Sequence, residues 1–86
     1  KVYCGKVVRY FSKLGVAEFK IEACQLNQGA KILVTGPTTG ALYSTAEEIR
    51  FDLGPVPVAK KGQHISIAMP QKVRRNDKLF IVIENA

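Results

Sequence analysis

A strict alternation of apolar and polar side chains restricts the fold of this chain more than any other feature. The segments "GVAEFKIEA" (residues 15–23) and "HISIAMP" (residues 64–70) both place apolar residues at every second position. These residues are Ala17, Phe19, Ile21 and Ala23 in the first segment and Ile65, Ile67 and Met69 in the second. A period of two is that of a β-strand with one buried face and one face in water. The pattern therefore predicts a sheet protein.

Short turn motifs separate the predicted strands. The segments "SKLG", "NQG", "GPTTG", "DLGP", "KKGQ" and "RRND" follow one another at short intervals, a spacing typical of sandwiches and small barrels. Closing the sheet would also remove its exposed edges. We therefore predict a single all-β domain over residues 1–86, a six- or seven-stranded, mostly antiparallel β-barrel. A chain of 86 residues is long enough for one compact domain and hardly for two.

The segment "STAEEIRF" (residues 44–51) allows two interpretations. Ser44 with Glu47, and Thr45 with Glu48, have the spacing of a capping box, which could begin a helix. The following "DLGP" would end that helix within two turns, and so short a helix is marginally stable. We favour a strand, and a short helix is the alternative.

The glycine-rich segment "TGPTTG" invites comparison with a phosphate-binding loop. Such a loop needs G-x-x-x-x-G-K-[ST] ahead of a helix, whereas Gly36 and Gly40 are four positions apart and Ala41 follows them. Pro37 and the two glycines instead suit a reversal of the chain. The segment is predicted to be a turn between strands, with no nucleotide site.

Catalytic and metal-binding patterns are not recognisable in the sequence. The single histidine, His64, falls on the polar face of its predicted strand, and no G-x-S-x-G motif surrounds a serine. Two cysteines, Cys4 and Cys24, are too few for a zinc site. We interpret them as reduced, buried residues in a reducing compartment, with a disulfide as the alternative. We therefore expect no catalytic residue, metal or cofactor, and no enzymatic activity from this chain alone.

The charge pattern is more informative, because thirteen basic and seven acidic residues give a net charge of +6. A basic domain favours polyanions such as RNA. Six cations lie in two turns that flank "HISIAMP", and they would form one phosphate-binding patch if both turns shared one end of a barrel. Ordinary solvated turns are the alternative. The predicted RNA-binding residues are Lys60, Lys61, Lys72, Arg74, Arg75 and Lys78. A second element, formed by Arg9, Tyr10, Phe11 and Lys13, combines charge with aromatic rings that could stack on bases; strand residues at the rim of the core are the alternative.

Two further expectations concern the natural context of the chain. Its first residue is lysine, so we expect a fragment of a larger protein. Its longest continuous apolar stretch, Leu79 to Ile83, is far shorter than the ~20 residues of a membrane helix. We expect a cytoplasmic protein with no membrane partner.

Several phrases of the sequence, in their order, resemble a known module. "GKVVRYFSKLGVAEFKI", "LNQGAKILVTG", "YSTAEEIRF" and "AKKGQHISIAM" are similar to successive parts of the β-barrel that forms the second domain of elongation factor Tu. "VVRYFSKLGVAEFKI", "GPTTG" and "VRRNDKLF" resemble more closely the C-terminal barrel of peptidase family U32, the collagenase-like proteases. Where the barrel family has Gly–Asp at one strand entry, this chain has Gly29–Ala30.

The resemblance implies a non-catalytic accessory β-barrel at the C-terminus of a U32-family peptidase, with the chemistry in a preceding, larger domain. Such a barrel would pack on the catalytic domain of the same polypeptide and assist substrate or RNA engagement. The wider family includes enzymes linked to hydroxylation of tRNA or rRNA bases. The alternative is a free-standing, elongation-factor-like module that binds RNA or tRNA. No catalytic or RNA-binding residue transfers from the family motifs to this sequence.

Overall fold

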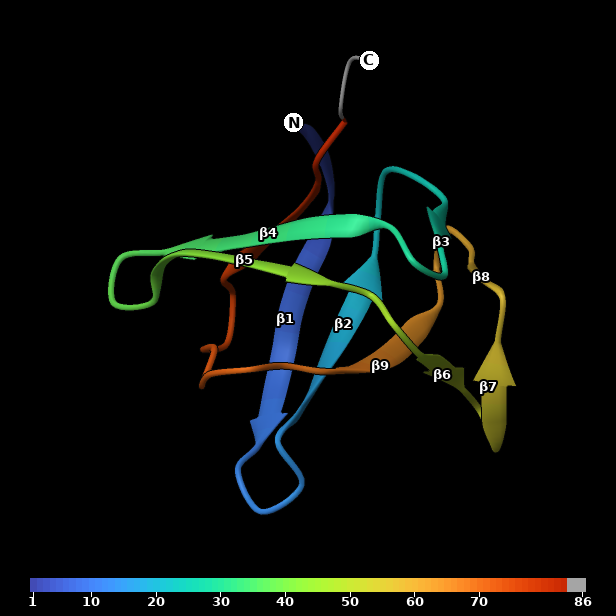
Figure 1. Cartoon of the computed structure of the whole chain (residues 1–86), viewed down its shortest axis with the longest axis horizontal. Coiled ribbons are helices and arrows are strands. Elements are labelled where there is room, and N and C mark those ends of the chain that lie inside the picture. The colour runs from blue at the N-terminus through green and yellow to red at the C-terminus, as the bar shows by residue number, and fades with distance from the viewer. Residues whose placement is uncertain (84–86) are drawn as a thin grey trace.

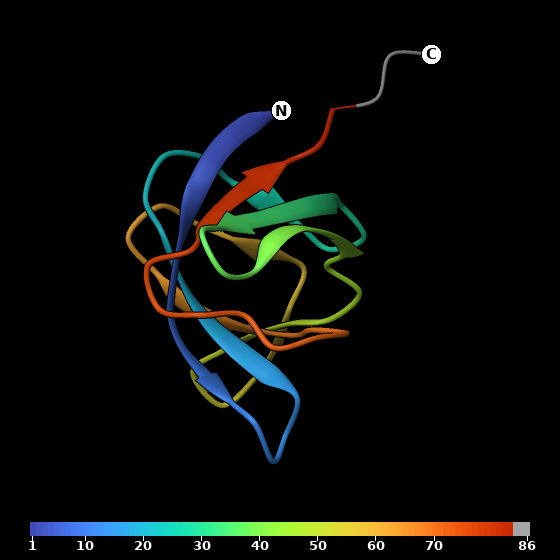
Figure 2. The ribbon, with the colours of Figure 1, turned by 90° about the vertical axis from the view of Figure 1, so that its left-hand side faces the viewer.

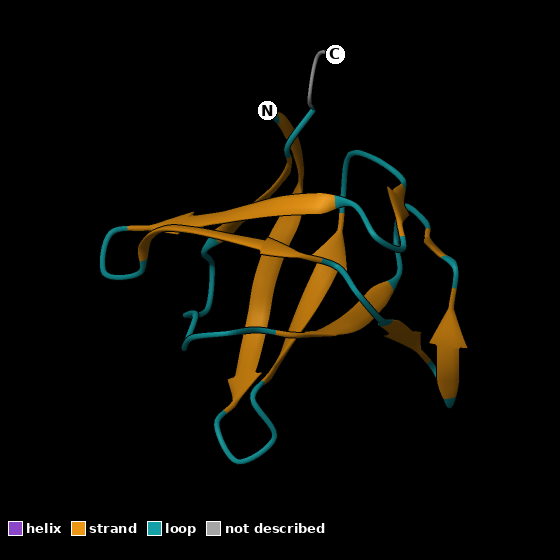
Figure 3. Ribbon diagram, viewed as in Figure 1, coloured by secondary structure: helices purple, strands orange, loops and turns teal. Residues whose placement is uncertain are grey.

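Strands are the only regular secondary structure in residues 1–83, the part of the chain that the structure, a computed structural model, describes (Figure 3). No helix is present there, so this part contains none that could cross a membrane. The strands are β1 (Val2–Phe11), β2 (Val16–Ile21), β3 (Leu26–Asn27), β4 (Lys31–Gly36), β5 (Gly40–Thr45), β6 (Ile49–Phe51), β7 (Gly54–Val56), β8 (Val58–Ala59), β9 (His64–Ala68) and β10 (Lys78–Ile81).

Eight of these strands form one antiparallel sheet in the order β5-β4-β10-β1-β2-β9-β6-β7, and β3 pairs separately with β8. The predictions of an all-β chain and of mostly antiparallel pairing are confirmed. The structure has more than the six or seven strands expected, because β3, β7 and β8 contain only two or three residues each. Strand pairing does not join β5 to β7, so it does not close the sheet into a barrel.

The long strand β1 bends the sheet. Its register shifts between Tyr3 and Gly5 against β10, and again between Val7 and Arg9 against β2. Such bulges increase local twist and curvature. Figures 1 and 2 show the result: β4 and β5 cross over β1 and β2 at a steep angle, so the sheet folds back over itself. Gly5 is required at one of these bends, because a Cβ there would overlap the backbone carbonyl oxygen of Lys20.

The core fills the space inside this curved sheet. The alternation prediction is confirmed for Phe19 and Ile21 of β2 and for Ile65 and Ile67 of β9, all of which are buried. Residues outside the strands complete the core, among them Val73 from the loop before β10. Each buried side chain of this size contributes roughly 1.5–3 kcal/mol relative to an exposed one. Inward-facing residues of paired strands therefore supply most of the favourable free energy of folding.

The "STAEEIRF" segment is extended rather than helical. β5 ends at Thr45, and β6 begins at Ile49. Between them the backbone N–H of Ala46 donates to the carbonyl of Ala30, which holds the chain against the β3–β4 connection. The prediction of a strand is confirmed on both sides of a short irregular link.

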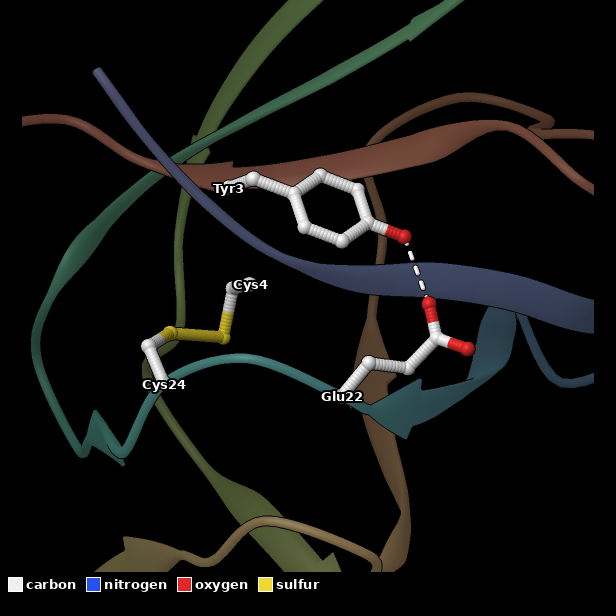
Figure 4. The surroundings of a disulfide bond; sticks show 4 residues. All are labelled: Tyr3, Cys4, Glu22 and Cys24. Atoms are coloured by element: carbon white, nitrogen blue, oxygen red, sulfur yellow. Dashed lines mark hydrogen bonds between the residues drawn. A yellow bond between two sulfur atoms is a disulfide. The ribbon is translucent and has the colours of Figure 1, made fainter.

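A disulfide joins Cys4 of β1 to Cys24 in the β2–β3 loop (Figure 4). The backbone N–H groups of Glu22 and Ala23 donate to the carbonyl of Cys4, and the two cysteine Cα atoms are 4.9 Å apart. That separation lies within the range of protein disulfides. The interpretation of both cysteines as reduced thiols is therefore wrong. It failed because the β2–β3 loop returns to β1, a long-range contact that residue spacing does not reveal.

A second interaction holds the same region together. The hydroxyl of Tyr3 donates a 2.5 Å hydrogen bond to the Glu22 carboxylate (Figure 4). This hydrogen bond is the main reason that the pKa of Tyr3 is raised above its usual value, and partial burial and the negative charge of Glu22 add to it. The Tyr3 phenol thus stays protonated to higher pH than a free tyrosine.

Replacing both cysteines by serine (Cys4→Ser with Cys24→Ser) is expected to lower the free energy of unfolding by about 2–4 kcal/mol, because the bridge restricts the unfolded chain. Urea unfolding followed by tyrosine fluorescence measures this loss. Dithiothreitol should lower the stability of the native chain and leave the double variant unchanged. Two reactive thiols in the natively folded, unreduced chain would contradict the prediction.

The Glu22→Gln variant should lower the pKa of Tyr3, because the charged acceptor of its hydrogen bond is removed. The stabilisation from this pair is present below the unfolded-state pKa of about 10 and is lost as the pH rises through the folded-state value. A titration of the Tyr3 ring signals by NMR measures the shift. Glu48→Gln is the control, since Glu48 is exposed and pairs with Arg50.

Candidate functional site

The "GPTTG" segment forms the turn of the β4–β5 hairpin, in which Gly36 pairs with Gly40. The prediction of a turn between strands is confirmed. The turn also reaches a distant part of the chain. The hydroxyl of Thr39 donates a 2.5 Å hydrogen bond to Oδ2 of Asp77, a carboxylate that is only 3% exposed.

Asp77 fixes the conformation of the loop that carries three of the predicted RNA-binding residues, Lys72, Arg74 and Arg75. Its Oδ2 atom also accepts a hydrogen bond from the backbone N–H of Arg74 at 2.9 Å, and its own N–H donates to the Arg74 carbonyl at 3.0 Å. Asn76 adopts a left-handed φ of 71° within this turn, a conformation that asparagine tolerates better than most residues. One buried carboxylate therefore holds both the loop and the β4–β5 turn.

The same loop is bonded along β1. The N–H of Val7 donates to the Asp77 carbonyl, and the N–H of Asn76 donates to the Val7 carbonyl, both at 2.8 Å. Between β1 and the loop lies a cleft of about 520 Å³, which we call the basic cleft. It is lined by Val8, Arg9, Tyr10, Lys72, Val73, Arg74 and Arg75.

Arg74 is positioned by its surroundings. Its Nη1 atom donates a 3.2 Å hydrogen bond to the Thr39 hydroxyl, so the side chain is held toward the β4–β5 turn. Lys72 and Arg75 are exposed. Arg9 forms an ion pair with Glu18, at 3.3 Å between Nε and Oε1. Glu18 therefore offsets part of the Arg9 charge, and the loop supplies the larger share of the positive potential.

The two groups of predicted RNA-binding residues lie at opposite ends of β9. Lys60 and Lys61 precede β9, in a turn whose Gly62 N–H donates to the carbonyl of Ile21. Lys72 and the arginines follow the other end of β9, and Figure 1 shows the two connections on opposite sides of the molecule. The two turns therefore do not share one end of the molecule, which was the condition for a single patch of six cations.

Lys78 is exposed at the start of β10, where it pairs with Lys6 of β1. It adjoins the loop through Asp77. The contribution that sequence analysis did not predict is the proximity of Arg9 and Tyr10 to the loop. Alternation in β1 could not reveal it, because the loop has no strand register.

His64 lies on the exposed side of β9, as expected from its place in the alternation. Its Nδ1 atom is 2.9 Å from Oε2 of Glu18. Within residues 1–83, no group of three histidine, cysteine, aspartate or glutamate side chains has a geometry suited to a metal ion.

Three exposed apolar side chains lie at or beside two other turns. Leu14, in the β1–β2 turn, is 72% exposed, and Leu53, in the β6–β7 turn, is 94% exposed. Figures 1 and 2 show both turns at the end of the molecule away from the N-terminus. Together with the partly exposed Phe11, these residues form what we call the apolar end. A groove of about 600 Å³ between the hairpins has a mixed lining: Phe11, Leu14, Val16, Glu18, Arg50, Asp52, His64 and Ser66.

Known proteins with similar sequences are proteases. A protein named collagenase from Porphyromonas gingivalis is 54% identical over 80 residues, which are 93% of this chain and 19% of that protein. An uncharacterised protease of Methanocaldococcus jannaschii is 30% identical over 84 residues, 98% of this chain and 20% of that protein. The chain thus spans about a fifth of the length of these relatives. No family model matches it.

The solved structures give the fold. The crystal structure of the C-terminal domain of a protein from Geobacillus thermoleovorans, assigned to the U32 peptidases, superposes with a TM-score of 0.87 at 15% identity. The match covers 95% of this chain and 93% of that domain. The resemblance to the U32 C-terminal domain is confirmed. A selenomethionine form of the same Geobacillus domain matches this chain with a TM-score of 0.85 at 16% identity, over 92% of the chain and 98% of the domain.

Gly36→Ala is expected to destabilise the fold by about 1–3 kcal/mol, because the added Cβ overlaps Oδ1 of Asp77. Gly54→Ala is the matched control, since a Cβ there meets no atom within 4 Å and Gly54 has no left-handed φ. Thermal unfolding of both variants measures the difference. Equal losses of stability would contradict the role given to Asp77.

Proposed function

We propose that this chain is a non-catalytic accessory domain of a U32-family, collagenase-like peptidase. In this proposal the domain packs on the catalytic part of the same polypeptide and helps it to engage its substrate. The observation that carries the proposal is the 54% identity to a collagenase, over a segment that makes up 19% of that protein. The larger part of such a protein lies outside the matched segment and has room for the catalytic residues.

The side chains of this domain support a non-catalytic role. Both cysteines are joined in the disulfide, so neither provides the thiolate that a cysteine nucleophile requires. His64 is bonded to Glu18 on an exposed strand face, with a side chain that is 51% exposed. A general base of a hydrolase would instead contact a nucleophile in a site that excludes water.

The apolar end supports the proposed packing on a catalytic domain. Leu14 and Leu53 are exposed on the β1–β2 and β6–β7 turns, two hairpins that β9 separates in the sheet, and burial of each against a partner would contribute roughly 1.5–3 kcal/mol. Exposed apolar residues that cluster are typical of interaction surfaces. The occupant that we propose is the remaining four-fifths of the polypeptide, as the lengths of the relatives indicate.

The second candidate function is the free-standing RNA- or tRNA-binding module, a barrel of the elongation-factor type. The basic cleft favours it, because Lys72, Arg74 and Arg75 are brought together with an aromatic side chain. A cytoplasmic location would suit this function and stays a prediction. The Cys4–Cys24 disulfide argues against that location, because disulfides are typical of oxidising compartments.

The test of the accessory role uses the Porphyromonas collagenase in three forms: intact, without its matching segment, and with that segment replaced by this chain. We expect collagen cleavage to fall at least ten-fold on deletion and to recover in the chimera. The chain alone should release no peptide. Turnover by the chain alone, or full activity after the deletion, would reject the proposal.

The docking surface is tested within the chimera. Leu14→Ser with Leu53→Ser should reduce cleavage several-fold, because an apolar contact is lost. Tyr43→Ser is the control, since Tyr43 is 67% exposed on β5, outside the apolar end. Equal effects of the two changes would show that the apolar end has no special part in docking.

A further inference from the structure

We propose that the basic cleft binds a single strand of nucleic acid, with phosphates on Lys72, Arg74 and Arg75 and a base stacked on Tyr10. This proposal does not depend on the proteolytic role, because it concerns the isolated domain. It replaces the six-residue patch expected from the sequence with a smaller site that joins one loop to β1.

The charges of the cleft suit phosphate groups. Lys72, Arg74 and Arg75 come from a stretch of four residues and line one cavity. Within residues 1–83, neither Lys72 nor Arg75 has a carboxylate at ion-pair distance. Their charges are available to a ligand, and an arginine can bind a phosphate through two parallel hydrogen bonds.

Arg74 is prepared for binding before any ligand arrives. Its backbone N–H is held by Asp77 and its Nη1 atom by Thr39. A side chain that is already ordered loses less conformational entropy on binding. The remaining guanidinium donors stay free to contact an anion, since the Thr39 hydrogen bond uses Nη1.

Tyr10 distinguishes the ligand class. It is half-buried: it packs against the edge of the hydrophobic core, opposite Ala17 of β2, and also lines the cleft. Base stacking on an aromatic side chain tolerates every base and requires an unpaired strand. A sulfated polysaccharide would match the cations but has no base to stack. The volume of about 520 Å³ lies within the ~300–1,000 Å³ of typical ligand sites.

The experiment measures the binding of a fluorescein-labelled uridine 12-mer to the 86-residue chain by fluorescence anisotropy, at several salt concentrations. Lys72→Ala with Arg75→Ala should weaken binding about ten-fold or more. The salt slope should become shallower by about 1.4, since each phosphate contact on a single strand contributes about 0.7. Lys60→Ala with Lys61→Ala removes the same charge at the other end of β9, and it should change affinity less than three-fold.

The stacking contact has its own pair of variants. Tyr10→Leu should weaken binding about 5- to 100-fold, and Tyr10→Phe, which keeps the ring, should bind like the native chain. Thermal unfolding of each variant confirms that it is folded. If Tyr10→Leu unfolds, the Lys72 and Arg75 pair and the comparison of the 12-mer with heparin and duplex RNA still decide the question.

Three results would overturn the proposal. One is an absence of binding at low salt. Another is an equal loss of affinity in the Lys60 and Lys61 control, which would indicate attraction by net charge. The third is heparin or duplex RNA bound more tightly than the 12-mer, with no effect of Tyr10→Leu, which would indicate a site for polyanions without stacked bases.

Discussion

The buried carboxylate of Asp77 is the interaction on which the proposed binding surface depends. It accepts hydrogen bonds from the β4–β5 turn and from the Arg74 backbone, while the backbone carbonyl of Asp77 accepts one from β1. A carboxylate buried to this degree is costly unless such partners are present. The carboxylate joins the β4–β5 turn to the loop, and backbone hydrogen bonds of Asn76 and Asp77 join the loop to β1. The cations of the loop are consequently held at a fixed place beside β1.

The sequence predicts the parts of this fold that depend on local pattern. The alternation in β2 and β9 identifies their buried faces, and the glycines identify the reversals between strands. The Thr39–Asp77 hydrogen bond joins residues 38 positions apart, and nothing near either residue indicates the other. The same holds for Cys4 and Cys24, whose approach depends on the path of the β2–β3 loop. The basic cleft could not be predicted from the sequence either. Tyr10 lines it together with Arg74 and Arg75 because the hydrogen bonds of Val7 hold the loop against β1.

The domain separates its surfaces by chemistry. Apolar residues project from two hairpins at one end, the loop cations lie beside β1, and Lys60 with Lys61 occupies the opposite end of β9. This separation would allow a partner domain and a charged ligand to bind at the same time, because neither surface contains residues of the other. One domain with a single hydrophobic core would then offer two separate binding surfaces. The glycine at position 36 contributes indirectly, because its missing Cβ leaves room for the carboxylate that orients the loop.

The disulfide near the start of β1 has a mechanical consequence. A pull on the N-terminus would first separate β1 from β10, which meet at Val2 and Ile81. Hydrogen bonds loaded at one end of a strand pair break one after another and resist little force. The disulfide at Cys4 stops the separation of β1 after three residues, because the force is then transmitted through the bond to the loop that follows β2. A domain tethered through its N-terminus could therefore hold a fibrous or moving partner without unravelling from the tether.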